Sequence, residues 1–298
     1  MPIVLVEQEK LNFTNLDKYI WPEDKVTKAD LINYYVQVSE YILPHLENRP
    51  MVFTRYPNGI AGKAFYQKNL PAYAPSWMDT YTEISLSTGR AKKINYALIN
   101  DLKSLLWSAN QACLELHPWL SSIDNLDCPK AAVFDLDPME ETDFEDVRKI
   151  ALALKELLLL EGLKGFPKTS GATGLQVYVP LVPKYTYQEV RSFAYFFCRV
   201  LEITFPQIVT TERKIIDRKG KLYLDYLQNI KGKTIIAPYS PRPRKGAPVS
   251  CPLEWEELSN GVTPDMFTLK SMPQRLKYKG DVFYEVLTCQ QKIDKWIN

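Results

Sequence analysis

The spacing of apolar residues along the chain predicts several amphipathic helices. In residues 28–43, apolar side chains recur every three or four positions and would line one helical face. Thr27 precedes this stretch and Asp30 follows three positions later, which is the pattern of a capping box at a helix N-terminus. The same period predicts further helices over residues 101–116, 142–161 and 186–204, and a short one near the C-terminus.

Short apolar runs between these stretches predict strands. Residues 51–56 form one such run, which ends at a Pro-Asn-Gly turn, and residues 131–138 form another, closed by a proline that cannot extend a β-ladder. Further strands are predicted at residues 175–181, 221–229 and 234–240. Strands and helices mix without strict βαβ alternation, so the predicted fold class is α+β, or mixed α/β. No linker of flexible composition interrupts the chain, which favours a single domain over residues 1–298.

Two carboxylates interrupt the apolar strand at residues 131–138. Asp135 and Asp137 are two positions apart, and side chains at i and i+2 of a strand point to the same face. Like charges buried side by side need a positive partner, and Mg²⁺ or Mn²⁺ suits ligands that are all oxygen. Alternatively, both residues cap the helix that follows. Asp225 is also flanked by apolar strand residues, as either a further ligand or a solvent-facing residue of an edge strand.

A glycine-rich stretch, KTSGATG at residues 168–174, precedes the predicted strand at 175–181. Its small residues would let backbone amides and the Ser170 hydroxyl approach the oxygens of a phosphate. The stretch lacks the Lys-Ser/Thr ending of a Walker loop, and no helix follows it. A plain tight turn is therefore the alternative interpretation.

Composition places the chain among ordinary globular proteins. Of its 298 residues, 46% are hydrophobic and 24% are charged, which excludes a disordered or fibrous chain. Two His are too few for a site of several His ligands, and five scattered Cys without a CxxC pair argue against a zinc finger and fit a reducing compartment. No apolar run approaches the roughly 20 residues of a membrane span. We expect a cytoplasmic protein without a membrane partner.

The charge is unevenly distributed along the chain. The whole sequence carries +2, but residues 213–245 hold ten Lys and Arg against two Asp, a net +8 around Asp225. Such a segment binds polyanions by electrostatic attraction and counterion release, unless it is only a solvated hairpin. Three carboxylates, a glycine-rich loop and a basic segment are together the components of two-metal phosphoryl or nucleotidyl transfer.

Motifs along nearly the whole chain resemble one known family. In order, they are WPEDKVTKADLINYY, RPMVFTRYPNG, AFYQKN, ANQACLELHPW, FDLDP, KTSGATGLQVYVPL, DYLQN and APYSPRPRKGAPVSCPLEW. They resemble the polymerase domain of bacterial ligase D, the nonhomologous end-joining polymerase of the archaeo-eukaryotic primase superfamily. The resemblance implies a primase-like fold, with mixed β-sheets around a central catalytic cleft and flanking helices, and a catalytic core at about residues 100–250.

The same resemblance implies an activity and partners. We expect a DNA-directed nucleotidyltransferase that fills gaps and extends 3′ ends at DNA breaks in nonhomologous end joining, prefers ribonucleotides, and uses two divalent ions, Mn²⁺ or Mg²⁺. Its substrates would be an NTP or dNTP and DNA with 5′-phosphorylated gaps or overhangs. Ku and a DNA ligase are the expected protein partners, and the expected location is the cytoplasm, at the nucleoid.

The resemblance also implies residue roles. The catalytic residues would be Asp135, Asp137 and Asp225, which form the metal triad, and His117, whose alternative is a core histidine. The nucleotide-binding residues would be Ser170, Gly171, Gly174, Gln176, Lys233, Arg242 and Arg244. The DNA-binding residues would be Lys18 and Lys28, which bind a 5′-phosphate, and Phe65 and Tyr66, which stack on template bases. Solvated lysines and a core aromatic pair are the alternatives for these four.

Two departures from the family pattern lie near the glycine-rich loop. Gln176 replaces a His that contacts nucleotide phosphate, and a neutral amide cannot become cationic. Ala172 and Thr173 stand where the family often carries a basic residue. A catalytically weak module that binds or aligns DNA ends is therefore an alternative to the polymerase. A phosphatase of the haloacid dehalogenase type is a third hypothesis, although Met139 stands where its nucleophile motif has Thr or Val.

Overall fold

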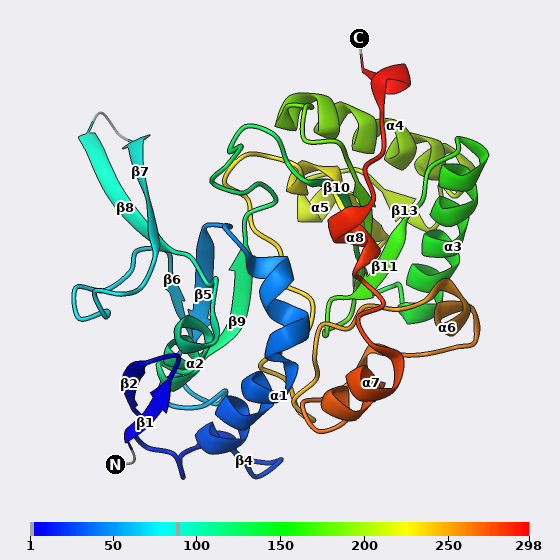
Figure 1. Cartoon of the computed structure of the whole chain (residues 1–298). Coiled ribbons are helices and arrows are strands. Elements are labelled where there is room, and N and C mark those ends of the chain that lie inside the picture. The colour runs from blue at the N-terminus through cyan, green and yellow to red at the C-terminus, as the bar shows by residue number, and fades with distance from the viewer. Residues whose placement is uncertain (1–2, 88–89, 298) are drawn as a thin grey trace. The chain divides into compact units, whose positions relative to one another are not determined.

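The computed structural model describes residues 3–87 and 90–297, and the chain divides into two compact units (Figure 1). Unit 1 consists of Met1–Asp124, Thr234–Val249 and Thr268–Gly280, and unit 2 consists of Asn125–Lys233, Ser250–Phe267 and Asp281–Asn298. Each unit therefore combines segments that are far apart in the sequence. The single domain over residues 1–298 stays a prediction.

Unit 1 is built on a five-stranded sheet. Its strands are β5 (Met51–Arg55), β6 (Phe65–Gln67), β7 (Thr80–Ser87), β8 (Arg90–Ala97) and β9 (Cys113–Pro118). They run in the order β6, β5, β8, β7, and β9 pairs with β5. β7 and β8 extend away from the other strands as a long hairpin (Figure 1). Two short hairpins precede this sheet, β1 (Ile3–Val6) with β2 (Glu9–Asn12) and β3 (Tyr19–Trp21) with β4 (Val26–Thr27).

The helices of unit 1 are α1 (Lys28–Leu46), α2 (Leu102–Asn110) and α7 (Met272–Lys279). α1 begins with the predicted capping box, because the Thr27 side chain accepts from the Asp30 amide and the Asp30 carboxylate accepts from the Thr27 amide. Its apolar face is buried, and the helix packs against α2 and α7. The capping residues at 27–30 therefore predict correctly where α1 begins, and the spacing of its apolar residues predicts which face is buried.

A second five-stranded sheet forms the core of unit 2. Its strands are β10 (Ala131–Asp137), β11 (Phe166–Thr169), β12 (Leu175–Pro180), β13 (Val209–Thr210) and β14 (Leu222–Asp225). They run in the order β11, β12, β10, β14, β13, and the sheet is mixed because only β13 and β14 pair in parallel. The α-helices of this unit are α3 (Phe144–Leu160), α4 (Tyr187–Thr204), α5 (Ile215–Arg218), α6 (Trp255–Ser259) and α8 (Glu285–Thr288). The 3₁₀ turns are η1 (Tyr226–Gln228), η2 (Pro264–Met266) and η3 (Asp294–Trp296).

α3 and α4 pack on the sheet of unit 2 and on each other. The ring centroid of Phe134 on β10 lies 6.1 Å from the centroid of Phe193 and 6.1 Å from that of Phe197, both on α4. Because side chains alternate along a strand, the neighbouring Asp135 and Asp137 project to the opposite face. Burial of the aromatic side chain under α4 thus decides which face displays the carboxylates.

The predicted elements at 131–138, 142–161 and 186–204 are confirmed as β10, α3 and α4, and the two sheets with their helices confirm the α+β class. Gly162, two positions after the last residue of α3, has φ 73°, as expected of a glycine that ends a helix. No helix within residues 3–87 and 90–297 is long and apolar enough to cross a membrane.

Other predicted elements are wrong. The helix predicted over 101–116 ends at Asn110, because Ala112 adopts φ 56° and the next residues pair with β5 as β9. The segment predicted as a strand over 234–240 does not form a regular strand: Thr234 makes an isolated bridge with Trp119, and the Ala237 amide donates to the Leu116 carbonyl oxygen of β9 at 2.9 Å. The predicted C-terminal helix is the single turn η3, and the first two residues of KTSGATG belong to β11 because they pair with β12.

Candidate active site

Four polar residues of unit 2 lie in one row across its sheet. In the pairing of β10 with β14, Asp135 is directly opposite Asp225. On the other side of β10, Asp135 is opposite Gln176 of β12, which in turn is opposite Lys168 of β11. Residues directly opposite one another share a face of the sheet. We call Lys168, Gln176, Asp135 and Asp225 the polar row, and Asp137 lies on the same face.

Asp135 is a partly buried carboxyl with like charges close to it. Burial raises its pKa well above the ordinary value, and the charges of Asp137 and Asp225 raise it further. A hydrogen bond from Gln176 and the charge of Lys168 lower the pKa, but they do not outweigh these effects. The Oδ1 atom of Asp135 is buried and has no hydrogen-bond partner. Because an unpaired buried oxygen is costly, this atom would gain from a cation beside it.

The residues on this face fit a hard divalent cation. Three carboxylates offer oxygen ligands, which Mg²⁺ and Mn²⁺ prefer. The unpaired Asp135 Oδ1 is available as one such metal ligand. Asp225 is engaged within the protein, since the Tyr223 hydroxyl donates to its Oδ1 at 3.1 Å. Among the residues that the structure describes, no three His, Cys, Asp or Glu side chains are gathered closely enough to surround an ion. The three carboxylates therefore fit a divalent cation by the chemistry of their oxygens and by lying on one face of the sheet.

The glycine-rich loop joins β11 to β12 beside the end of β10. The Ser170 Oγ accepts from the amides of Ala172 at 3.2 Å and Gly174 at 3.1 Å, which closes the loop on itself. Gly171 has φ 69°, a conformation that favours glycine. A Cβ atom on Gly174 would lie 2.5 Å from the carbonyl oxygen of Leu136, so only glycine fits there. The loop therefore packs directly on the strand that carries the acidic pair.

Lys168 is a site residue that sequence reasoning missed. Its side chain is fully buried, and its Nζ donates to Gln176 Oε1 at 2.5 Å and to Ser250 Oγ at 2.6 Å. Gln176, at the position where the family resemblance implies a His, is itself only 3% exposed. The spacing of eight residues between Lys168 and Gln176 across a short loop is the one signal in the sequence, because a hairpin places such residues side by side.

Unit 1 contains a second charged cluster, around Glu115 of β9. The Arg242 Nε lies 3.1 Å from Glu115 Oε1, and the His117 Nε2 lies 3.5 Å from Glu115 Oε2 and 3.4 Å from Thr54 Oγ1. Burial acts to raise the pKa of Glu115, but the hydrogen bond from His117 and the charge of Arg242 hold it below its usual range. Sequence reasoning missed Glu115 because it assigned residues 101–116 to a helix. Residues 113–118 instead form a strand, in which alternation places Glu115 on the same face as His117.

Exposed aromatic rings and cations alternate over β5 and β6 of unit 1. Phe65 is 55% exposed and Tyr66 is 57% exposed, so they are not a core pair. The Arg55 guanidinium lies 6.0 Å from the Phe65 ring centroid, and the Lys68 ammonium lies 5.9 Å from that of Tyr66. Arg55 also donates to the Tyr73 hydroxyl at 3.1 Å. These five residues, which we call the aromatic surface, line a pocket of about 510 Å³ and suit a single-stranded nucleic acid.

The two predicted phosphate-binding lysines lie near each other but differ in environment. Lys18 is exposed, and its Nζ donates to Asn58 Oδ1 at 3.0 Å. Lys28 is only 4% exposed, and its Nζ donates to Thr14 Oγ1 at 3.2 Å and to Asn110 O and Oδ1 at 3.0 and 2.9 Å. Burial and the charge of Lys18 lower the pKa of Lys28 to about 8. Lys28 is therefore not a solvated surface lysine.

The predicted site residues are divided between the two units. Unit 2 carries Asp135, Asp137, Ser170, Gly171, Gly174, Gln176, Asp225 and Lys233, and unit 1 carries Lys18, Lys28, Phe65, Tyr66, His117, Arg242 and Arg244. The basic segment 213–245 is divided in the same way, between residues 233 and 234. Lys233 and Arg244 are exposed, whereas the Arg218 guanidinium stacks 3.7 Å from the ring centroid of Tyr223.

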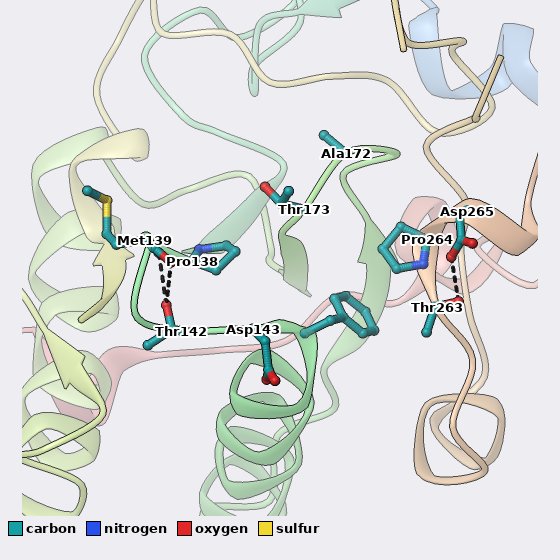
Figure 2. A pocket seen from close by; sticks show the side chains of 10 residues that line it. Pro138, Met139, Thr142, Asp143, Ala172, Thr173, Thr263, Pro264 and Asp265 are labelled. Atoms are coloured by element: carbon teal, nitrogen blue, oxygen red, sulfur yellow. Dashed lines mark hydrogen bonds between the residues drawn. The ribbon is translucent and has the colours of Figure 1, made fainter. Parts of the chain in front are cut away.

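A pocket of about 350 Å³ opens beside the glycine-rich loop (Figure 2). It is lined by Pro138, Met139, Thr142, Asp143, Phe144, Ala172, Thr173, Thr263, Pro264 and Asp265. Two of its hydroxyls are bonded within the wall, because Thr142 bonds to the backbone of Met139 and Thr263 donates to Asp265. The loop thus presents to this pocket small, uncharged side chains, where the family often carries a basic residue.

A family model and two bacterial relatives are similar to this chain in sequence. A model of the LigD primase-polymerase domain matches residues 27–283. The chain is 40% identical over 277 residues to the bifunctional non-homologous end joining protein LigD of Bacillus subtilis, and 35% identical over 278 residues to the multifunctional LigD protein of Mycolicibacterium smegmatis. These matches cover 93% and 92% of this chain but 44% and 36% of the relatives. The chain therefore spans less than half the length of these two relatives.

A solved structure, the polymerase domain of Mycobacterium tuberculosis ligase D in complex with DNA, is similar throughout. It matches with a TM-score of 0.86 and 32% identity, over 94% of this chain and 99% of that one. The match confirms the resemblance found in the sequence motifs and rules out the phosphatase hypothesis. By sequence and by fold, this chain belongs to the LigD primase-polymerase domain family.

Proposed function

We propose that this chain is a DNA-directed nucleotidyltransferase that extends 3′ ends and fills gaps at DNA breaks during nonhomologous end joining, with a preference for ribonucleotides. The observation that carries the proposal is the pairing of Asp135 with Asp225, with Asp137 on the same face, beside a loop packed on the same strand. Membership of the LigD primase-polymerase family supports it, as does the similar ligase D domain solved in complex with DNA.

Asp135, Asp137 and Asp225 would hold two divalent ions, Mn²⁺ or Mg²⁺. When bound, such ions supply an activated 3′-hydroxyl and neutralise the charge of the leaving pyrophosphate. Backbone amides of the glycine-rich loop would orient the triphosphate. In unit 1, Arg242 and Arg244 would grip phosphate oxygens, to which a planar guanidinium is suited, and Lys233 of unit 2 would add positive charge.

The DNA would be bound by residues of unit 1. Phe65 and Tyr66 are exposed enough to stack on template bases, and stacking tolerates any base sequence. Lys18 and Lys28 would bind the 5′-phosphate of the downstream strand. His117 of unit 1, which lies beside Glu115, is the fourth residue that we propose as catalytic.

Primer extension on a gapped duplex with a 5′-phosphate tests the proposal. We expect incorporation of a ribonucleotide with Mn²⁺, at a higher rate than of the matching deoxyribonucleotide. Asp137→Ala should reduce incorporation to background, whereas Asp127→Ala, which changes an exposed carboxylate of the same unit, should leave it unchanged. No incorporation by the wild type with either ion, or extension by Asp137→Ala at the wild-type rate, would contradict the proposal.

A second candidate is a catalytically weak module that binds or aligns 5′-phosphorylated DNA ends. The observation that favours it is Gln176, a neutral amide that is buried beside Asp135 at a position where the family resemblance implies a His. This candidate predicts tight binding to phosphorylated overhangs without synthesis at any metal concentration. Synthesis by the Gln176→His variant alone would then assign the loss of activity to this one residue.

We also propose Ku and a DNA ligase as partners in the cytoplasm, at the nucleoid. This follows from family membership, because the relatives are named as non-homologous end joining proteins. Gap filling on a broken duplex should increase when a bacterial Ku is added. An unchanged rate over a range of Ku concentrations would contradict the partnership.

A further inference from the structure

Lys168 is an ammonium group buried within unit 2. Its side chain has no exposed surface, and its Nζ donates to two neutral oxygens, Gln176 Oε1 and Ser250 Oγ. The Ser250 hydroxyl is held in turn, because it donates to the carbonyl oxygen of Thr169 at 2.8 Å. A buried charge is costly unless it is well bonded and balanced by an opposite charge. The opposite charge here is Asp135, one position further along the polar row.

The chemistry of lysine determines how the Gln176 amide is turned. An ammonium can only donate hydrogen bonds, so the side-chain carbonyl of Gln176 must face Lys168. The NH₂ group then faces the other neighbour in the row, Asp135, and donates to its carboxylate. One carboxylate oxygen is occupied in this way, while Asp135 Oδ1 is left without a hydrogen-bond partner.

We propose that Lys168 is a positioning residue of the active site: it holds the Gln176 amide with its NH₂ group toward Asp135, so that one oxygen of this carboxylate is bonded and the other stays open to a ligand. The identity of the ligand that Asp135 binds rests on the proposed function, but the orientation of the Gln176 amide does not. Without Lys168, the two similar ends of the amide could exchange places. A carbonyl oxygen would then face the carboxylate and repel it.

Side-chain NMR of the metal-free full chain tests the orientation directly. In protein labelled with ¹⁵N-glutamine, the Gln176 NH₂ signal is identified by its loss in Gln176→Ala. We expect slow hydrogen exchange of this group in the wild type and exchange at least about tenfold faster in Lys168→Met. Lys164→Met, which removes an exposed lysine nearby, should leave the exchange rate unchanged. Equal exchange rates in Lys168→Met and wild type would overturn the proposal.

Kinetics test whether Lys168 acts through Gln176. Lys168→Met and Gln176→Ala should each lower kcat/KM for the nucleotide by roughly tenfold, and the double variant should be no worse than either single one, because coupled residues are not additive. Multiplied losses in the double variant would overturn the proposal, since Lys168 would then act independently of Gln176. Absence of incorporation by the wild type would contradict the proposed function, and the exchange measurement would still decide the role of Lys168.

Further variants separate positioning from mere filling of space. Lys168→Arg can also only donate, so it should keep the Gln176 NH₂ group protected even where the larger side chain lowers Tm. If Lys168→Met does not fold, Lys168→Gln replaces it, because an amide there can donate or accept and no longer determines the orientation. Fast exchange in Lys168→Gln supports the proposal, and wild-type protection in this variant overturns it.

Discussion

Asp135 and Asp225 are direct partners in the antiparallel pairing of β10 with β14, and Asp135 Oδ1 is buried there without a hydrogen-bond partner. Two apolar residues would stabilise these central sheet positions better than two like charges. Natural proteins break packing rules of this kind at functional sites. The acidic positions are therefore expected to lower the stability of the metal-free protein.

Replacing Asp135 by the isosteric Asn should stabilise the metal-free protein while abolishing nucleotide incorporation. The amide removes a buried charge beside Asp137 and Asp225, and a gain of about 1–2 kcal/mol would raise Tm by about 2–6 °C. Calorimetry with and without Mn²⁺ checks this, and the rise in Tm caused by Mn²⁺ should shrink in the variant. Asp127→Asn, an exposed control, should change neither value. A lower Tm for Asp135→Asn would contradict the expectation.

Binding of a 5′-phosphate should weaken as pH rises, because the pKa of Lys28 is lowered to about 8. Below that pH Lys28 is cationic and attracts the phosphate, and above it the amine becomes neutral. The bound phosphate favours the cation, so the loss should be centred somewhat above pH 8. Fluorescence anisotropy between pH 7 and 10, with 5′-phosphate and 5′-hydroxyl duplexes, checks this.

The matched variants for this test are Lys28→Gln and Lys10→Gln, the second of which changes an exposed lysine of the same unit. Lys28→Gln should remove most of the preference for the 5′-phosphate at pH 7, and Lys10→Gln should keep it. A wild-type preference that is constant from pH 7 to pH 10 would show that Lys28 does not bind the phosphate.

Removing the exposed rings of the aromatic surface should weaken DNA binding without affecting folding. Phe65→Ala and Tyr66→Ala should each cost about 1–3 kcal/mol of binding to a template overhang, because each ring would stack on one base. Since both rings are more than half exposed, Tm should stay within the error of the wild type. Tyr278→Ala, which removes a ring that is 87% exposed on α7, is the control. Equal losses for all three variants would indicate a non-specific effect.

The pair of buried Glu115 and partly buried Arg242 should matter for both stability and nucleotide use. Glu115→Gln leaves the Arg242 charge without its partner, and we expect a loss of about 1–3 kcal/mol in the free energy of unfolding and a higher KM for the nucleotide. Urea denaturation and steady-state kinetics check the two effects. Glu23→Gln breaks an exposed pair with Lys245 and should cost less than about 1 kcal/mol. Similar losses in both variants would show that burial does not set the strength of the Glu115 pair.

Local patterns predicted some of these features, and non-local pairing produced the others. The common face of Asp135 and Asp137 follows from alternation along one strand, and the capping box at Thr27 from four consecutive residues. The position of Asp225 directly opposite Asp135 depends on a register between two residues 90 positions apart, which no local pattern specifies. Glu115 was missed because the predicted helix has a different period from the strand that forms. Lys168 was missed because its burial depends on Ser250, a remote partner.

The close contact of Gly174 with Leu136 has a consequence for how the site responds to a nucleotide. The Gly174 backbone lies so close to β10 that a Cβ there would be 2.5 Å from the Leu136 carbonyl oxygen, and the next residue, Leu175, pairs directly with Leu136, so this end of the loop is anchored on β10. A triphosphate seated on the loop would therefore find the acidic side chains at a distance that is set in advance by the chain itself. Selection between correct and incorrect nucleotides would then depend on which substrates fit that distance, without a loop that closes over them.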